Sequence, residues 1–446
     1  MCRKTSMPTP ALIVLALMFT AMPAAAQAPA QATGPGGGDQ GSGMSTPTPV
    51  GGQGYSMDFA TETPRTNYIT GGLGFTTAYD DGVGFNGTNP ISDVSYTILP
   101  TIGLNQSRSH LNWNFLYSPG FTFYQKETAL NQANQNASLS LNYRLSPHVA
   151  LSVFDTFRQT SDALGPSGQN PSNSGIGGVL NTPVTVIAPV ADQISNSGAV
   201  SISYQFAANA MVGASGIFSF LEFPNPGQAV GFSNSHARGG NAFYSYRFSG
   251  RHYVGASYAY QEFRTTQNLG ATSIVPVTDG QSLLLFYTFY LTPRTSFSLN
   301  GGPQRATTNG LVQWTPAVQA SFGWSGPRTS VAASAGHSIA PGNGLSGATK
   351  STAAGASVRR QLSRHLTAGI GADYSDNQTL GSLALLATNG HALSGNASLQ
   401  VALGEHLGLG IGYTRVHQEY SNITGSPDRN RVWASLSYQF QRPLGR

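Results

Sequence analysis

The sequence predicts an all-β protein, a single transmembrane antiparallel up-and-down β-barrel of about 18 strands, with about 16 as the alternative. The first observation is charge. Only 9% of the residues are Asp, Glu, Lys or Arg, against about 25% in an ordinary soluble domain. The second is a hydrophobic content of 39%, without the long apolar runs that membrane-spanning helices need beyond the N-terminus. The third is a repeated strand-turn-strand unit that continues to the C-terminus.

Residues 1–26 are expected to be a signal peptide. Arg3 and Lys4 supply a basic start, Ala11–Thr20 an apolar segment, and Ala24–Ala26 a small-residue cleavage site. Cys2, the only cysteine, would be removed with this segment, so no disulfide is expected. The sequence therefore predicts export, and localisation in the cell outer membrane.

Residues 27–66 are rich in Gly, Pro, Gln and Thr and are expected to form a disordered periplasmic tail, which leaves 67–446 for the barrel. The formal charge falls from +5 to +3 when Arg3 and Lys4 are removed. That charge is too mild to indicate nucleic-acid binding.

The repeat is a strand that ends near an aromatic residue or Leu, passes through a short polar turn and resumes its alternation. The predicted turns are 106–109, 143–148, 204–209, 246–251, 290–294, 324–328, 361–365 and 403–406. Ala137–Leu145 illustrates the alternation, because its odd positions are Ala, Leu, Leu, Tyr and Leu while its even positions are polar. Successive side chains of a strand point to opposite faces, so each strand has one apolar and one polar face.

A soluble β-sandwich would alternate in the same way. Two features favour the barrel: the polar face is small and uncharged, and the aromatic residues gather at strand ends, as in the interfacial girdles of membrane barrels. One girdle is predicted from Tyr143, Tyr204, Phe206, Tyr246, Phe248 and Tyr290 near the short turns. The other is predicted from Phe157, Phe220, Phe263, Tyr374 and Tyr413.

The predicted strands begin near residues 68, 92, 109, 135, 149, 194, 210, 237, 252, 280, 295, 313, 329, 350, 366, 392, 407 and 431. Short turns then alternate with longer loops, and an even count places both ends of the barrel on the periplasmic side. Three positions do not fit the scheme. Asp155 shares the parity of the lipid-facing residues, so a bulge is expected to shift the register there. Pro100 and Pro316 remove hydrogen-bond donors inside predicted strands.

The final strand, Trp433–Phe440, resembles the C-terminal signal of bacterial outer-membrane barrels, in which alternate hydrophobic residues end in an aromatic residue. The resemblance implies recognition of Trp433, Tyr438 and Phe440 by the barrel-assembly machinery, although residues 441–446 follow the aromatic. Segments such as Leu291–Leu299 resemble the β-barrel porin families. The resemblance implies an outer-membrane environment of lipid and lipopolysaccharide more firmly than any substrate.

No catalytic constellation is readable, so the chain is predicted not to be an enzyme and to need no cofactor. Four histidines, His148, His252, His365 and His406, lie at short turns that do not converge on a metal ion, and no metal site is assigned. The carboxylates of Asp80 with Asp81, or Asp373 with Asp376, are expected to be solvated, with a surface cation site as the alternative.

The leading functional hypothesis is a porin-like channel for passive diffusion of small hydrophilic solutes. The charged residues predicted to line the pore are Arg144, Arg158, Arg247, Arg359 and Asp373. Arginine predominates, which favours anions or neutral solutes weakly. The longest predicted loop, 161–194, resembles in position the loop that narrows general porins, with a merely exposed loop as the alternative.

Two other functions stay open: a barrel associated with exopolysaccharide export, and a structural or adhesive surface barrel without transport. A homo-oligomer is also left open, because no interface can be assigned from the sequence.

Overall fold

The barrel is seen in a computed structural model of the chain. It describes residues 67–86, 89–161, 191–225, 232–269, 272–274, 276–342, 344–345, 347–380, 389–421 and 428–444. The signal peptide and tail predicted for residues 1–66, and most of the loop 161–194, lie outside these residues.

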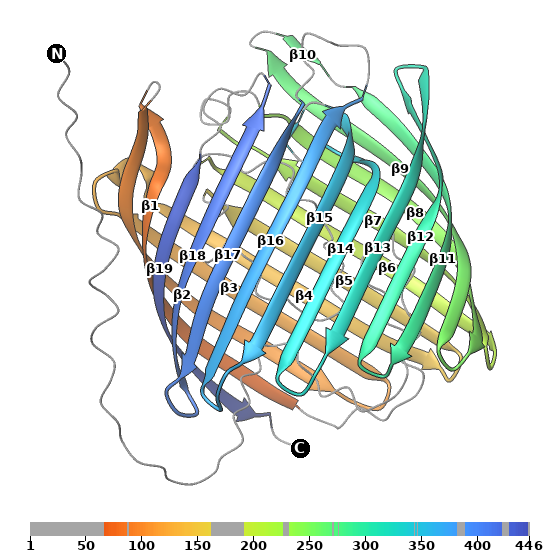
Figure 1. The fold of residues 1–446 in the computed structure, drawn as a ribbon, viewed down its shortest axis with the longest axis horizontal. Coiled ribbons are helices and arrows are strands. Elements are labelled where there is room, and N and C mark those ends of the chain that lie inside the picture. The colour runs from red at the N-terminus through yellow and green to blue at the C-terminus, as the bar shows by residue number, and fades with distance from the viewer. Residues whose placement is uncertain are drawn as a thin grey trace. The chain divides into compact units, whose positions relative to one another are not determined.

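In the described residues, eighteen long strands follow one another in antiparallel pairing around a closed sheet (Figure 1). They are β1 (Asn67–Asn86), β2 (Asn89–Ser107), β3 (Leu111–Tyr124), β4 (Gln132–Ser146), β5 (Val149–Thr160), β6 (Gln193–Ala207), β7 (Ala210–Glu222), β8 (Asn234–Ser249), β9 (His252–Leu269), β11 (Val277–Thr292), β12 (Thr295–Thr308), β13 (Leu311–Ser325), β14 (Thr329–Pro341), β15 (Ala348–Gln361), β16 (Leu366–Thr379), β17 (Gly390–Ala402), β18 (Leu407–Tyr420) and β19 (Arg429–Pro443). The short β10 (Thr272–Ile274) pairs with β9 beyond the barrel wall, and η1 (Thr128–Leu130) is a single 3-10 turn. Within the described residues, no helix has the length and apolar content needed to cross a membrane.

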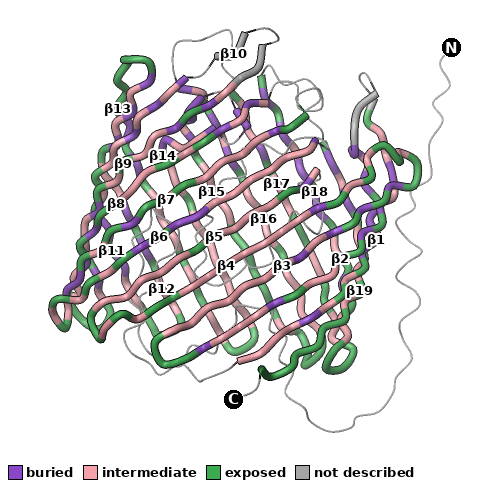
Figure 2. The backbone as a smooth tube through the Cα atoms, turned by 180° about the vertical axis from the view of Figure 1, so that it is seen from behind, coloured by how far each residue is buried: buried purple, intermediate pink, exposed green. Residues whose placement is uncertain are grey.

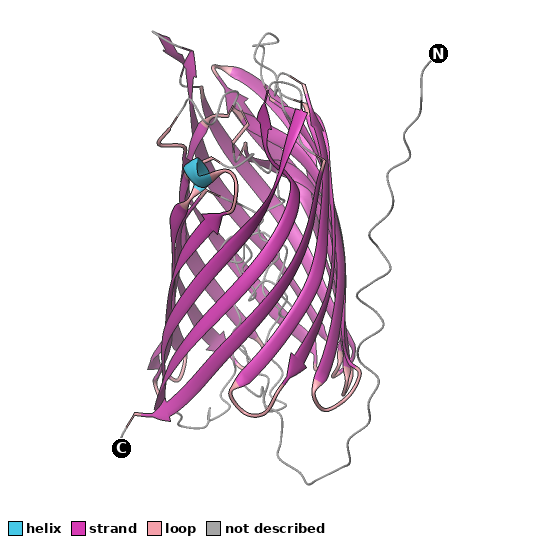
Figure 3. Ribbon diagram, turned by 90° about the vertical axis from the view of Figure 1, so that its left-hand side faces the viewer, coloured by secondary structure: helices cyan, strands magenta, loops and turns pink. Residues whose placement is uncertain are grey.

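Closure comes from β19 pairing with β1, in register from Tyr68 opposite Pro443 to Asp80 opposite Arg431. The prediction of about 18 strands is confirmed, and every predicted start lies within three residues of the observed one. Short turns join the strands at the end where β19 finishes (Figure 3), which is the periplasmic end by the rule for these barrels.

The prediction that all connections at the opposite, extracellular end are long is wrong at two places in the described barrel. One joins β1 to β2 between Asn86 and Asn89. The other joins β12 to β13 through Asn309 and Gly310, whose φ angles are 49° and 83°. Positive φ at both central residues is the requirement of a tight type I′ hairpin turn, and Asn-Gly is its preferred sequence.

Burial alternates along the strands, as the two-residue period predicts (Figure 2). Outward positions carry large exposed apolar side chains, such as Leu283 and Leu285 on β11. The inward neighbours are mostly Ser, Thr, Asn, Gln and Gly, such as Thr278 and Ser282 on β11. Because lipid offers no hydrogen bonds, a closed sheet with an apolar exterior is the form in which strands cross a bilayer. The protein is an outer-membrane β-barrel.

Outward aromatic residues form two girdles, but two predicted members face inward. Tyr290 lies opposite Ser296 on the inner face, and its ring meets the inward ring of Tyr253 edge-on at 5.8 Å. Phe263 is also inward and is 2% exposed. Both residues belong to strands whose inner face also carries apolar side chains. The prediction that they face outward, which rested on residue type, is therefore wrong.

Glycines on the inner wall make room for aromatic rings of neighbouring strands. A Cβ atom built on Gly412 would lie 2.4 Å from Cζ2 of Trp433, and one on Gly255 would lie 2.2 Å from Cζ of Phe286. The rings therefore cover the glycine backbones of the adjacent strands. This packing accounts in part for a glycine-rich sequence with 54 such residues.

The bulge predicted at Asp155 is not present. β5 stays in unbroken register with β4 and β6 through Asp155, which faces outward between Leu139 and Gly198. The amide of Asn196 donates to both carboxylate oxygens, at 3.2 and 3.3 Å. This outward carboxylate is satisfied by an amide donor instead of being turned inward.

Trp433, Tyr438 and Phe440, the proposed assembly signal, all lie on the closing strand β19. Tyr438 and Phe440 face outward in register with Leu73 and Gly71, whereas Trp433 faces the lumen. The strand continues beyond Phe440 to Pro443 and stays paired with β1. Recognition by the assembly machinery remains a prediction.

Near the extracellular end, the closing seam holds a buried ion pair between Arg429 of β19 and Asp80 of β1. The two side chains are 1% and 4% exposed. The Asp80 carboxylate also accepts the backbone N–H of Gly82 at 3.0 Å. Loss of one partner leaves the other charge buried.

We therefore expect Arg429→Met to destabilise the barrel by about 1–3 kcal/mol, because the buried Asp80 carboxylate loses a charge-assisted hydrogen-bond partner while Arg431 stays opposite it. The free energy of unfolding is measured by urea titration of the protein in detergent, with the heat-dependent shift of its gel band as the readout of the folded fraction. Arg442→Met, at an exposed position of the same strand, is the control and should change stability by less than about 0.5 kcal/mol. Equal effects of the two substitutions would contradict a structural role for the seam pair.

Candidate functional site

The lumen is the candidate site, and its wall carries more cationic than anionic side chains. Among the described residues, the inward-facing charged side chains are those of Arg144, Arg158, Arg247, Arg359, Arg429, Arg431, Asp80, Asp93 and Asp373. Arginine thus predominates, as the sequence suggests.

The five predicted pore-lining residues all lie on the inner face by register, and they come from five different strands. Arg158 lies between Asn136 and Ser195, and Asp373 lies between Gly355 and Ser394. Arg247 lies at the periplasmic rim, where its guanidinium donates to the carbonyl of Ala208 at 3.2 Å. The residues are therefore distributed around the wall and do not form one cluster.

Arg144 and Arg359 lie near the same rim, beside the turns that join β4 to β5 and β15 to β16. The charge at the extracellular end was not predicted from the sequence. There Asp80 pairs with Arg429, and Asp93 accepts the backbone N–H groups of Val94, Lys126 and Glu127. These carboxylates are already engaged, so they offset less of the arginine charge.

The cation site considered for neighbouring aspartates is not formed. Asp81 accepts the backbone N–H and the side-chain amide of Asn430, at 2.6 and 2.7 Å. Asp373 faces inward while Asp376 faces outward opposite His391. Neither pair of carboxylates converges on a common point.

At the upper end of the β14–β15 hairpin, β14 separates from β13 and bends into the extracellular mouth. Pairing of β13 with β14 ends at Val318 opposite His337, whereas β14 stays paired with β15 up to Pro341 opposite Ala348, and β15 stays paired with β16 up to Thr349 opposite Thr379. Pro316 lies just beyond the point where β14 departs, so its missing N–H costs no ladder hydrogen bond. The structure thus explains Pro316 by the departure of a strand.

Pro100 has a related explanation. It stays opposite Leu73 of β1, but the pairing of β2 with β3 is interrupted between Ile98 and Ile102. The proline lies within that interruption, on the side where the ladder is already broken.

Gln304, on the inner face of β12, anchors the bent hairpin. Its side chain accepts the backbone N–H of Ile339 at 2.8 Å and donates to the Ile339 carbonyl at 3.1 Å. All of these groups are buried. The amide therefore takes the place of β13 as the hydrogen-bonding neighbour of this part of β14.

Apolar packing continues from this anchor. Ile339 and Ala348 of the hairpin form one buried cluster with Phe263 of β9, Ala306 of β12 and Leu380. Phe263 and Ala306 belong to the inner wall. The face of the hairpin that carries Ile339 and Ala348, which points outward in the lower part of the same strands, therefore rests against the inside of the barrel. Phe263 serves this contact instead of the membrane girdle.

The tip of the hairpin reaches two further parts of the mouth. The Gly344 carbonyl accepts the backbone N–H of Ser233 at 2.9 Å, just before β8. Leu345 is fully buried against Phe232, Ala392 of β17 and Tyr420 of β18. Because β8 and β17 lie on nearly opposite sides of the closed sheet, these contacts carry the hairpin across the mouth.

The segment predicted to narrow the lumen was the loop 161–194, of which residues 162–190 lie outside the described part of the chain. In the described residues, the β14–β15 hairpin is the segment that reaches into the extracellular mouth. The sequence held a signal for it, because Leu345 is a lone apolar residue between glycines in 342–347.

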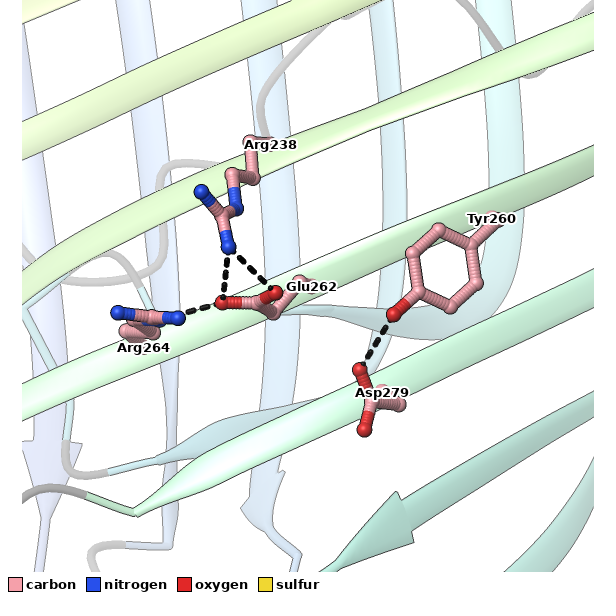
Figure 4. A network of polar contacts seen from close by, with 5 residues as sticks. All are labelled: Arg238, Tyr260, Glu262, Arg264 and Asp279. Carbon is pink, nitrogen blue, oxygen red and sulfur yellow. Dashed lines mark hydrogen bonds and ion pairs between the residues drawn. The ribbon is translucent and has the colours of Figure 1, made fainter.

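A network of charged side chains lies on the outer face of β8, β9 and β11 (Figure 4). The Glu262 carboxylate of β9 accepts a hydrogen bond from the Arg238 guanidinium of β8 at 2.9 Å and also pairs with Arg264. The hydroxyl of Tyr260 donates to the Asp279 carboxylate at 2.7 Å. These residues face away from the lumen. They contribute to the outer surface and not to the permeation path.

Comparisons with known proteins find no matching family model and no similar curated protein at the level of sequence. Solved structures that are similar include Pseudomonas aeruginosa OccK2 (OpdF) in complex with glucuronate, at 10% identity, with 85% of this chain and 98% of that chain covered and a TM-score of 0.42. Acinetobacter baumannii OccAB4 matches at 10% identity, 84% and 99% coverage and a TM-score of 0.42. The FrpB iron transporter from Neisseria meningitidis matches at 9% identity, 85% and 82% coverage and a TM-score of 0.41. The fold and the site rest on the strand pairing and lining residues of this chain.

Gln304→Ala should release the hairpin, because it leaves the Ile339 N–H and carbonyl buried without partners, at a cost of about 1–3 kcal/mol. We expect faster amide hydrogen exchange at residues 337–350, while the remaining strands stay protected. Gln400→Ala, an exposed inward position of β17, is the matched control. Unchanged exchange in Gln304→Ala would show that this side chain does not hold the hairpin.

Proposed function

We propose that the protein is a porin-like channel for passive diffusion of small hydrophilic solutes, with its extracellular mouth narrowed by the β14–β15 hairpin. The observation that carries the proposal is the polar inner face of a large closed barrel. A barrel of about 16–18 strands leaves an aqueous channel, whereas one of about eight is filled by its own side chains. Ser, Thr, Asn and Gln on the wall suit passage of hydrated solutes without strong binding.

Arginine predominates on the described inner wall, so the channel should favour anions weakly over cations. Arg158 is the most informative position, because it lies among Asn136, Ser195 and other uncharged side chains. The rim residues Arg144, Arg247 and Arg359 act at the periplasmic entrance.

The packed mouth favours small solutes over a polymer. Ile339, Ala348 and Leu345 are held by buried apolar contacts on the wall and on β17 and β18. A chain such as an exopolysaccharide would have to pass beside this hairpin, so polymer export is the less favoured function. An adhesive barrel without transport predicts no conductance at all.

The test is conductance of the purified full chain in planar lipid bilayers. We expect discrete steps of conductance. In a salt gradient, the sign of the reversal potential should show a preference for anions, because the described inner wall carries a net positive charge. Arg158→Glu should move the reversal potential toward cations. Arg238→Glu, on the outer wall, should leave it unchanged. A folded barrel that gives no steps would overturn the channel proposal.

Replacing residues 342–347 by Asn-Gly removes the tip contacts at the mouth while a tight turn still joins β14 to β15. The single-channel conductance should rise relative to the parent protein. An unchanged conductance would place the narrowest point elsewhere in the lumen.

A further inference from the structure

Three side chains with metal-binding chemistry meet on the outer face of the barrel near its extracellular end. They are His391 of β17, and His417 and Glu419 of β18. His391 lies directly opposite Glu419, and His417 lies opposite Leu393, one outward position further along the sheet. Strand register alone therefore places all three on one face.

The geometry of the group suits a single ion. One ligand atom from each side chain lies within 4.8 Å of the others. The two imidazole rings have their centroids 5.9 Å apart. Small side-chain rotations would bring the atoms to the spacing of ligands around a common ion, since ligand bonds to zinc are about 2.0–2.2 Å long.

A second observation concerns the orientation of His417. Its Nδ1 is hydrogen-bonded to the carboxylate of Asp428, just before β19. In metal sites, a ligating histidine usually donates its other ring nitrogen to a carboxylate, which fixes the tautomer and raises the basicity of the ligating nitrogen. With Nδ1 engaged in this way, Nε2 of His417 is the nitrogen available to a metal ion.

The surrounding charges also favour a cation. Asp376 of β16 lies opposite His391, so the group has carboxylates on three sides from Asp376, Glu419 and Asp428. The cations nearest to the group by register are Arg415, two residues before His417 and opposite Gly395, and Lys350 of β15, opposite Gln378. The three carboxylates outnumber these two cations.

We propose that His391, His417 and Glu419 bind a first-row transition-metal dication of the Zn²⁺ type, with Asp428 positioning His417. Two imidazoles and one carboxylate suit zinc, nickel or copper, whereas calcium and magnesium prefer all-oxygen ligands. Three protein ligands leave a fourth position for water or a solute. The ion would join β17 to β18 at the outer surface, outside the permeation path.

The sequence alone predicts no metal ligands, because the histidines that stand out in it lie at the short turns. His391 and His417 lie far apart in the chain, and only the β17–β18 register brings them together. No motif of fixed spacing marks the site.

The proposal is tested by calorimetric titration of the untagged full chain in detergent with ZnCl₂ near neutral pH. We expect one equivalent to bind, and that equivalent to be lost in His391→Ala and in His417→Ala. Glu419→Gln and Asp428→Asn should each weaken binding about 10–100-fold, the latter through the orientation of His417. Acidification should also abolish binding, because only neutral imidazole ligates.

His365→Ala, at a periplasmic turn, is the matched control and should bind as the parent protein does. The heat-dependent gel shift verifies that each variant is folded, and His391→Gln serves if the alanine variant is not. Absence of stoichiometric binding, or its retention in a folded His391→Ala/His417→Ala double variant, would overturn the proposal. Neither result depends on whether the barrel conducts.

Discussion

The structure depends on one constraint: a backbone surrounded by lipid must satisfy its own N–H and C=O groups. An open sheet would leave two edges of unpaired groups in hydrocarbon, and pairing of β19 with β1 removes both. Closure then fixes what each residue faces, because alternate side chains point to lipid and to the lumen. The apolar exterior and the polar interior are consequences of this one requirement.

The same constraint explains the local exceptions. Where β14 separates from β13, the Gln304 amide supplies the hydrogen bonds that β13 would otherwise give to Ile339. Where a carboxylate faces outward at Asp155, the Asn196 amide binds it. Both of these departures from the regular pattern have a polar partner. Because its backbone groups are satisfied, the hairpin at the mouth is an integral part of the fold.

Much of the fold could be predicted from the sequence, because strand alternation and turn residues are local properties. The predicted start of β5 at residue 149 is the observed one. The inward face of Phe263 and the bend of the β14–β15 hairpin could not be predicted, since the alternation continues unchanged through Ile339. Contacts such as His391 with Glu419 depend on register between strands, and local sequence does not fix their side-chain geometry.

The most direct test of the central claim is thiol labelling of paired positions on β17. Ser398 faces the lumen, whereas Leu399 faces outward opposite Ile411, and Cys2 is the only native cysteine. In liposomes holding the reconstituted protein, a small membrane-impermeant maleimide should label Ser398→Cys and spare Leu399→Cys, because only the lumen holds water at this depth. Equal labelling of both positions, or labelling of Leu399→Cys alone, would contradict a barrel that is wet inside and surrounded by lipid.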